Sequence, residues 1–161
     1  MRHTTIEFFL FLGVFTIMVV SATLLFKKAY DSPCWHKDDG FVCVTYVDNY
    51  DADTITVNIP GVHPFLGAKA KVRLVGVDTP EIRGGNACEK RKAIEAKEYV
   101  KGRLVGKTLS LYNVQRGKYF RIVADVVVDG VSLSKELIAI GYGFPYDGGK
   151  KQTRDWCREL L

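Results

Sequence analysis

The chain has 161 residues, a formal net charge of +5, 47% hydrophobic residues and 25% charged residues. This length suits one compact domain, since domains commonly contain about 100–150 residues. The composition excludes a disordered or collagen-like chain, and four cysteines are too few for a densely cross-linked scaffold. The excess of lysine and arginine favours a polyanionic partner, although many basic proteins have none.

The N-terminal segment differs from the rest of the chain. Residues 8–26 are apolar and uncharged, which is about the length that crosses the roughly 30 Å bilayer core as a helix, and Lys27 and Lys28 follow them. We therefore predict a membrane anchor over residues 1–28 and a linker over residues 29–40. A cleaved secretory signal is the main alternative, because residues 20–22 resemble a small-residue cleavage site, and a buried core helix is a third.

The four cysteines indicate an oxidising compartment. Cys34 and Cys43 flank a turn-like segment, and Cys88 and Cys157 would then remain for each other, although four cysteines allow three connectivities. We expect a bacterial-type inner membrane protein whose domain faces the periplasm or the exterior. Signal cleavage would instead give a secreted protein.

The first half of the globular part reads as three strands and a helix. The strand segments are rich in β-branched residues and cover residues 41–47, 54–59 and 71–77, with a loop over residues 62–68. Asn86 is then positioned to cap a helix in which Ala93, Ala96 and Val100 recur at helical spacing.

The second half adds two strands, over residues 108–114 and 119–128, and a helix that ends at Gly141. A short helical stretch is expected from about Thr153. Five short strands with a helix between the third and fourth are typical of an OB-type barrel. The predicted fold is therefore mainly β with α (α+β): a five-stranded OB-fold barrel over residues 41–161 with two or three helices, preceded by the N-terminal hydrophobic helix.

Charged residues at the ends of these strands point to a chemical site. Arg73 lies inside an apolar strand, where its guanidinium must reach solvent, a carboxylate or an anion. Asp53, Asp78 and Glu81 lie at strand ends, and Arg121 begins the predicted fifth strand. Two arginines and three carboxylates of this kind suit a phosphate diester.

Each of these residue types has a plausible role in phosphodiester chemistry. Asp53 and Asp78 can supply oxygen ligands to a hard cation. Glu81 is a candidate for orienting or deprotonating a water molecule, and the arginines can neutralise charge that grows on the phosphate oxygens.

Several segments resemble the thermonuclease (staphylococcal nuclease-like) family. Residues 72–81, Val-Arg-Leu-Val-Gly-Val-Asp-Thr-Pro-Glu, resemble its signature, and residues 51–54, Asp-Ala-Asp-Thr, resemble its first acidic motif. Residues 118–121, Lys-Tyr-Phe-Arg, resemble its second arginine motif, and the helix end at residues 137–141 also matches. The motifs occur in the family's order, and the resemblance spans about residues 41–157.

The resemblance implies a calcium-dependent phosphodiesterase that cleaves DNA and RNA and leaves 3′-phosphate ends. By motif position, the catalytic residues are Arg73, Glu81 and Arg121. The calcium ligands are Asp53, Asp78 and the backbone carbonyl of Thr79. The predicted substrate contacts are Lys118 and Tyr119 to a terminal phosphate, with Tyr146 as a candidate for stacking on a base.

One departure from the family pattern concerns Ala52, which stands where the family usually has glycine. A positive φ at this position would cost about 1 kcal/mol or displace Asp53, and would weaken metal binding. We expect a monomeric nuclease tethered to the membrane by its N-terminal helix. The alternative function is a catalytically weak or inactive OB-fold module that binds nucleic acid without cutting it.

Overall fold

A computed structural model describes Met18, Cys34 and residues 36–37, 39–151 and 154–157. The chain divides into two units, residues 1–35 and residues 36–161. The predicted membrane anchor and cleavage site lie outside the described residues, apart from Met18, which is helical. None of the helices in the described part of the chain is long and apolar enough to span a membrane.

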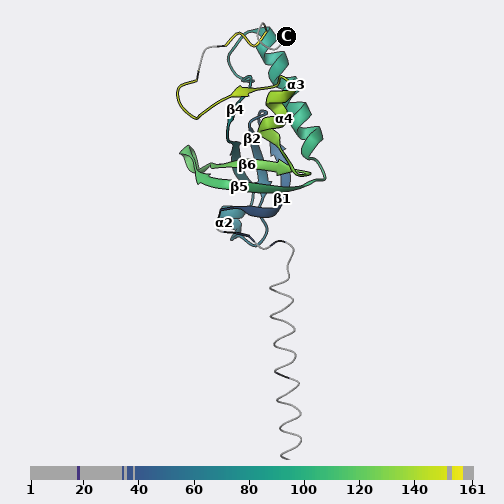
Figure 1. Cartoon of the computed structure of the whole chain (residues 1–161), viewed down its shortest axis with the longest axis vertical. Helices are drawn as coiled ribbons and strands as arrows, with labels where there is room; N and C mark the ends of the chain where they lie inside the picture. The colour runs from purple at the N-terminus through teal and green to yellow at the C-terminus, as the bar shows by residue number, and fades with distance from the viewer. Residues whose placement is uncertain (1–17, 19–33, 35, 38, 152–153, 158–161) are drawn as a thin grey trace, which may run out of the picture. The chain divides into compact units, whose positions relative to one another are not determined.

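The second unit is built around a closed barrel of five strands (Figure 1). The strands are β1 (Phe41–Asn49), β2 (Thr54–Asn58), β3 (Ala70–Leu74), β5 (Thr108–Arg116) and β6 (Ile122–Val128). Neighbours pair antiparallel in the order β3-β2-β1-β5-β6, and a parallel pairing of β3 with β6 closes the barrel. This architecture is consistent with an OB-fold and confirms the predicted fold class.

The barrel interior is filled by side chains that alternate along each strand. Ile55 and Val57 of β2 are fully buried, and so are Val126 and Val128 of β6. Since full burial of such a side chain contributes about 1.5–3 kcal/mol, the period-two pattern supplies much of the driving force for closure.

Three helices accompany the barrel in the described residues: α2 (Pro64–Gly67), α3 (Ala87–Leu104) and α4 (Leu133–Ala139). Figure 1 shows α3 and α4 at one end of the barrel and α2 at the other. The side chain of Asn86 caps α3 as predicted, because its Oδ1 accepts a hydrogen bond from the Glu89 amide at 2.9 Å.

The two longer helices are joined by an ion-pair network around Arg103. Its Nε donates to Glu136 of α4 at 2.9 Å, and its Nη1 lies 2.8 Å from Asp129 in the turn after β6. Tyr99 of α3 donates its hydroxyl to the same glutamate. These contacts fasten α3 and α4 to the end of the β6 strand.

Several local predictions were wrong. Residues 62–68 contain α2 instead of only a loop, because Pro64 begins the helix and His63 caps it. The strand expected over residues 71–77 is interrupted at Gly76, whose φ of +81° turns the chain before β4 (Val77–Asp78).

The strand expected over residues 119–128 begins only at residue 122, because Lys118–Phe120 form a short 3₁₀ segment, η1. The short strands β7 (Val131–Ser132) and β8 (Phe144–Pro145) were not anticipated. The described part of the expected C-terminal helical stretch, residues 154–157, contains no helix.

The C-terminal end is fastened to the start of α3 by a disulfide between Cys88 and Cys157, as predicted. Trp156 is buried beside this bridge, and its ring centroid lies 5.2 Å from that of Phe144. Cys34 and Cys43 are disulfide-bonded as well.

Candidate active site

Strand register places the two predicted catalytic arginines on one face of the barrel wall. Arg73 of β3 pairs with Thr54 of β2 on one side and with Val123 of β6 on the other. Arg121 lies two positions before Val123, in extended backbone, so period-two alternation puts its side chain on the same face as Arg73. The core-facing positions on either side of Arg73 are Val72 and Leu74, both buried.

Arg73 lies between two buried aspartates. Its Nη1 forms an ion pair with Oδ1 of Asp53, and its Nη2 lies 3.6 Å from Oδ1 of Asp78. The side chains of the two aspartates are only 3% and 7% exposed. Buried carboxylates require such compensation, because desolvation strongly disfavours an isolated charge. Within the described residues the Nη2 atom is buried and has no hydrogen-bond partner, although it takes part in the ion pair with Asp78.

Asp78 reaches this position through the turn at Gly76 and the short β4–β8 pairing. In that pairing Asp78 is the register partner of Phe144. Gly143 lets the two segments approach closely, since an added Cβ there would meet a Val77 methyl at 2.6 Å. Thr79, the predicted carbonyl ligand, follows directly and is 1% exposed.

A third carboxylate, that of Asp51, joins the cluster from the loop between β1 and β2. Buried Asn49 holds this loop, because its Nδ2 donates to the Asp51 carbonyl at 2.9 Å and to the Lys97 carbonyl of α3 at 3.1 Å. In the part of the chain that the structure describes, the Oδ1 atom of Asp51 is buried without a hydrogen-bond partner.

The surroundings of Asp51 disfavour its charge. Burial, followed by the negative charges of Asp53 and Glu81 and a hydrogen bond with Asp53, raises the pKa of Asp51 to about 7, although Arg73 opposes the shift. Burial and the neighbouring carboxylates therefore both favour the protonated form of Asp51.

Lys151 supplies a second cation to the cluster. Its Nζ lies 2.7 Å from Oδ1 of Asp78 and 2.5 Å from Oε1 of Glu81. Partial burial disfavours the ammonium, but the hydrogen bonds and charges of the two carboxylates outweigh burial and raise the pKa of Lys151. One lysine thus bridges a predicted metal ligand and a predicted catalytic residue.

A cleft of about 560 Å³ is lined by Asp51, Arg73, Glu81 and Lys151, whereas the buried Asp53 and Asp78 are not among its lining residues. The structure brings together in its lining all three predicted catalytic residues and two of the three predicted substrate contacts: Arg73, Glu81, Arg121, Lys118 and Tyr146. The third contact, Tyr119, is not in this lining and lies in a neighbouring groove. Tyr146 is anchored by its hydroxyl, which donates to the Gly149 carbonyl at 2.6 Å.

The donor set fits a hard divalent cation in its chemistry. Asp53 and Asp78 are buried carboxylates, and oxygen donors of this kind suit calcium. In the described residues, no group of three or more acidic, histidine or cysteine side chains is arranged so that it could hold a metal ion. The predicted site needs only two carboxylates and a main-chain carbonyl, from Thr79.

The substitution at Ala52 does not impose the strain that the sequence suggested. Among the described residues Ala52 is not one of those with a positive φ, and it is fully buried in the hydrophobic core. Its methyl group therefore contributes to packing beneath the loop that carries Asp51 and Asp53.

Sequence reasoning assigned no role to Asp51 or Lys151. Asp51 had a detectable signal, because it stands two positions before Asp53 in the first acidic motif. Lys151 follows two glycines and another lysine, which is the composition of a solvated turn, so no sequence signal indicated its contacts with Asp78 and Glu81.

The barrel and the charged cleft define a nuclease-type domain, and similarity to known proteins agrees. Residues 71–158, more than half of the chain, match the family described as staphylococcal nuclease homologue, so this chain belongs to the staphylococcal nuclease family. That family is metal-dependent. An uncharacterized protein of Bacillus anthracis is 33% identical over 96 residues, which cover 58% of this chain and 42% of that protein. The chain thus spans less than half of that relative's length.

Proposed function

We propose that this protein is a calcium-dependent nuclease that hydrolyses phosphodiester bonds of DNA and RNA and leaves 3′-phosphate ends. The observation that carries the proposal is that Arg73, Glu81 and Arg121 line one cleft beside buried aspartates. Phosphodiester cleavage develops negative charge on the phosphate, so paired guanidiniums and an oriented carboxylate in one cleft meet its main requirements.

The arginines are the groups that bind the phosphate. Guanidinium forks match phosphate oxygens and stay charged at all relevant pH values. The ion pair of Arg73 with Asp53 fixes its orientation, and Arg73 lines the cleft in which the phosphate would lie. Arg121, which directly precedes β6, approaches from the same face.

Glu81 is the group that handles the attacking water. Its side chain is 46% exposed and lines the cleft, so it can accept a hydrogen bond from water and orient it for in-line attack. Lys151 must leave Glu81 for this role, because its ammonium contacts Oε1. A calcium ion bound by Asp53, Asp78 and the Thr79 carbonyl would supply Lewis-acid stabilisation of the phosphate.

We also propose that the nuclease is exported and acts as a monomer tethered to the membrane by residues 1–28. The uncharged run over residues 8–26 and the oxidised cysteines support this location. Mass spectrometry of the mature protein isolated from membranes tests it. Recovery of an intact N-terminus supports the anchor, whereas a chain that begins after residue 22 supports secretion.

The central experiment is digestion of single-stranded DNA and RNA by the full chain, in calcium and then in EGTA. We expect cutting only in calcium, with product ends that resist polymerase extension until a 3′-phosphatase removes the phosphate. Arg73→Ala and Glu81→Gln are expected to lose at least about 100-fold in rate. Arg91→Ala and Glu98→Gln, on the exposed face of α3, are the matched controls.

A binding module without cleavage is the second candidate, and the Lys151–Glu81 contact is the observation that favours it. Such a module would bind oligonucleotides in calcium without shortening them. If Arg73→Ala and Glu81→Gln cut as fast as the unaltered chain, the assigned roles are wrong.

A further inference from the structure

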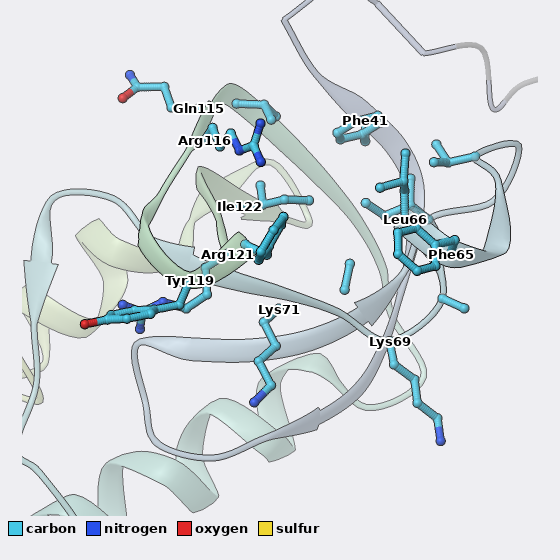
Figure 2. A pocket seen from close by; sticks show the side chains of 16 residues that line it. Phe41, Phe65, Leu66, Lys69, Lys71, Gln115, Arg116, Tyr119, Arg121 and Ile122 are labelled. Atoms are coloured by element: carbon cyan, nitrogen blue, oxygen red, sulfur yellow. The ribbon is translucent and has the colours of Figure 1, made fainter.

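A groove of about 720 Å³ lies beside the candidate active site and is larger than the cleft itself. Gln115 and Arg121 line both the groove and the cleft, so the two hollows adjoin. The groove extends from the β5–β6 connection across the start of β3 to α2. Figure 2 shows Phe65 and Leu66 at one end of it and Tyr119 at the other.

The groove exposes aromatic rings to an unusual degree. Phe65 is 88% exposed, Tyr119 86% and Phe120 89%. Large apolar side chains gathered on one exposed surface typically mark a binding site. The backbone also presents two of these rings at a conformational cost, because Tyr119 and Phe120 both have a φ of +58°, a left-handed region that disfavours residues with side chains.

Basic side chains edge the same groove. Figure 2 shows Lys69 and Lys71 along one edge and Arg116 near the other. The guanidinium of Arg116 lies 5.4 Å from the ring centroid of Phe120, in cation–π geometry. No aspartate or glutamate occurs among the residues that line this groove, so its charge is uniformly positive.

We infer that the groove binds a single-stranded stretch of nucleic acid that continues from the phosphodiester held in the cleft. Bases would stack on Phe65 and Phe120, and phosphates would lie against Lys69 and Lys71. This combination of aromatic platforms and cations is how sequence-tolerant single-strand binding works. The inference rests on the proposed function, because the cleft fixes where the strand enters.

The observations favour a nucleic acid over a lipid bilayer as the occupant. A bilayer contacts a protruding apolar surface, whereas these rings line a groove that adjoins the phosphodiester cleft. Cations along both edges match a polyanion that runs between them better than a flat layer of headgroups on one side.

The test measures the fluorescence anisotropy of a labelled 12-nucleotide oligothymidylate with the full chain in neutral detergent micelles, in EGTA to prevent cleavage. Phe65→Ala and Phe120→Ala are each expected to weaken binding about tenfold, and the charge reversals Lys69→Glu and Lys71→Glu are expected to weaken binding and flatten its salt dependence. Ile94→Ala and Val105→Ala remove apolar side chains that are exposed elsewhere and should leave the affinity unchanged. Thermal unfolding verifies that every variant is folded.

A second measurement concerns substrate length. In calcium, we compare kcat/KM for the 12-nucleotide substrate with kcat/KM for a dinucleotide. The ratio of the two values should fall about tenfold in Phe65→Ala, because the KM of the 12-nucleotide substrate rises. If the affinity and this ratio stay the same in the aromatic variants, the inference is overturned. It is also overturned if transfer into phosphatidylcholine nanodiscs weakens oligonucleotide binding to the level of Phe65→Ala, since the bilayer then occupies the groove.

Failure of the proposed function gives a different result. If the chain binds the oligonucleotide with the expected dependence on Phe65 and Phe120 but cuts no substrate in calcium, the groove assignment stands and the nuclease proposal fails.

Discussion

The ammonium of Lys151 lies 2.7 Å from Oδ1 of Asp78, an oxygen that the proposed calcium site requires. The same ammonium contacts Oε1 of Glu81. A cation carried by the chain itself therefore neutralises the carboxylates that metal and water would use. Binding of a divalent cation must displace this lysine, and the two events are thermodynamically linked.

Replacing Lys151 by methionine is therefore expected to strengthen calcium binding about threefold. The gain is modest because the lysine side chain is 42% exposed, and partly solvated ion pairs contribute little. Isothermal titration calorimetry with calcium measures it. Lys101→Met is the matched control, because this exposed lysine of α3 does not line the cleft or the hollow beside Asp78. Weaker calcium binding in Lys151→Met would show that the lysine organises the site instead of competing for it.

Removal of Arg73 should destabilise the metal-free protein. Arg73→Met leaves Asp53 buried without its cation, and breaking a buried pair in this way costs about 3 kcal/mol. Calcium should restore part of the lost stability, because it supplies positive charge to the same carboxylates. Thermal unfolding in EGTA and in calcium measures both effects. An unchanged Tm in EGTA would mean that solvent already stabilises Asp53.

The pKa of Asp51 predicts a pH-dependent stability in EGTA. The carboxyl holds its proton up to about pH 7 in the folded chain, compared with 3.8 for the ordinary group. Between these values the folded chain binds more protons than the unfolded chain, so its stability falls as the pH rises and then levels off above pH 7.

Asp51→Asn removes this titration. The free energy of unfolding of Asp51→Asn minus that of the unaltered chain should therefore rise by about 2–4 kcal/mol between pH 4 and pH 7. Above pH 7 this difference should stay constant. Urea unfolding at each pH gives the comparison. A difference that does not change with pH would show that the folded structure does not raise the pKa of Asp51.

The Arg103 network predicts a stability effect that is separate from catalysis. Arg103→Met breaks the contacts to Glu136 and Asp129 and should cost about 1–3 kcal/mol, since this arginine side chain is only 21% exposed. Lys107→Met, which removes an exposed pairing with the same Asp129, should change stability by less than about 0.5 kcal/mol. Denaturant unfolding measures the stability of each variant, and a nuclease assay measures its activity separately. An equal loss in the free energy of unfolding for Arg103→Met and Lys107→Met would contradict a stabilising role for the Arg103 network.

The barrel was predictable because its signals are local. β-branched alternation identified the strands, and Asn86 marked the start of α3. The residues of the candidate site were predictable by type, since an arginine within an apolar strand must find an anion or a carboxylate. The sequence motifs therefore predicted that Arg73, Glu81 and Arg121 belong to one site, and in the structure all three line one cleft.

The missed features depend on backbone geometry and on long-range contacts. The interruption at Gly76 needs a positive φ that no periodicity reveals, and the left-handed Tyr119 shortens β6 in the same way. The contact of Lys151 with Glu81 joins positions 70 residues apart, so it depends on how the C-terminal segment returns to the barrel.

The bridge from Cys88 to Cys157 encloses the exposed loop that holds Gly148 and Gly149. A protease that cuts this loop would open the chain without releasing a fragment, since the covalent link spans the cut. The nicked molecule would migrate as a single species until a reductant separates its two pieces. Lys151 would then leave with the smaller piece, and the carboxylates that it contacts would remain with the larger one.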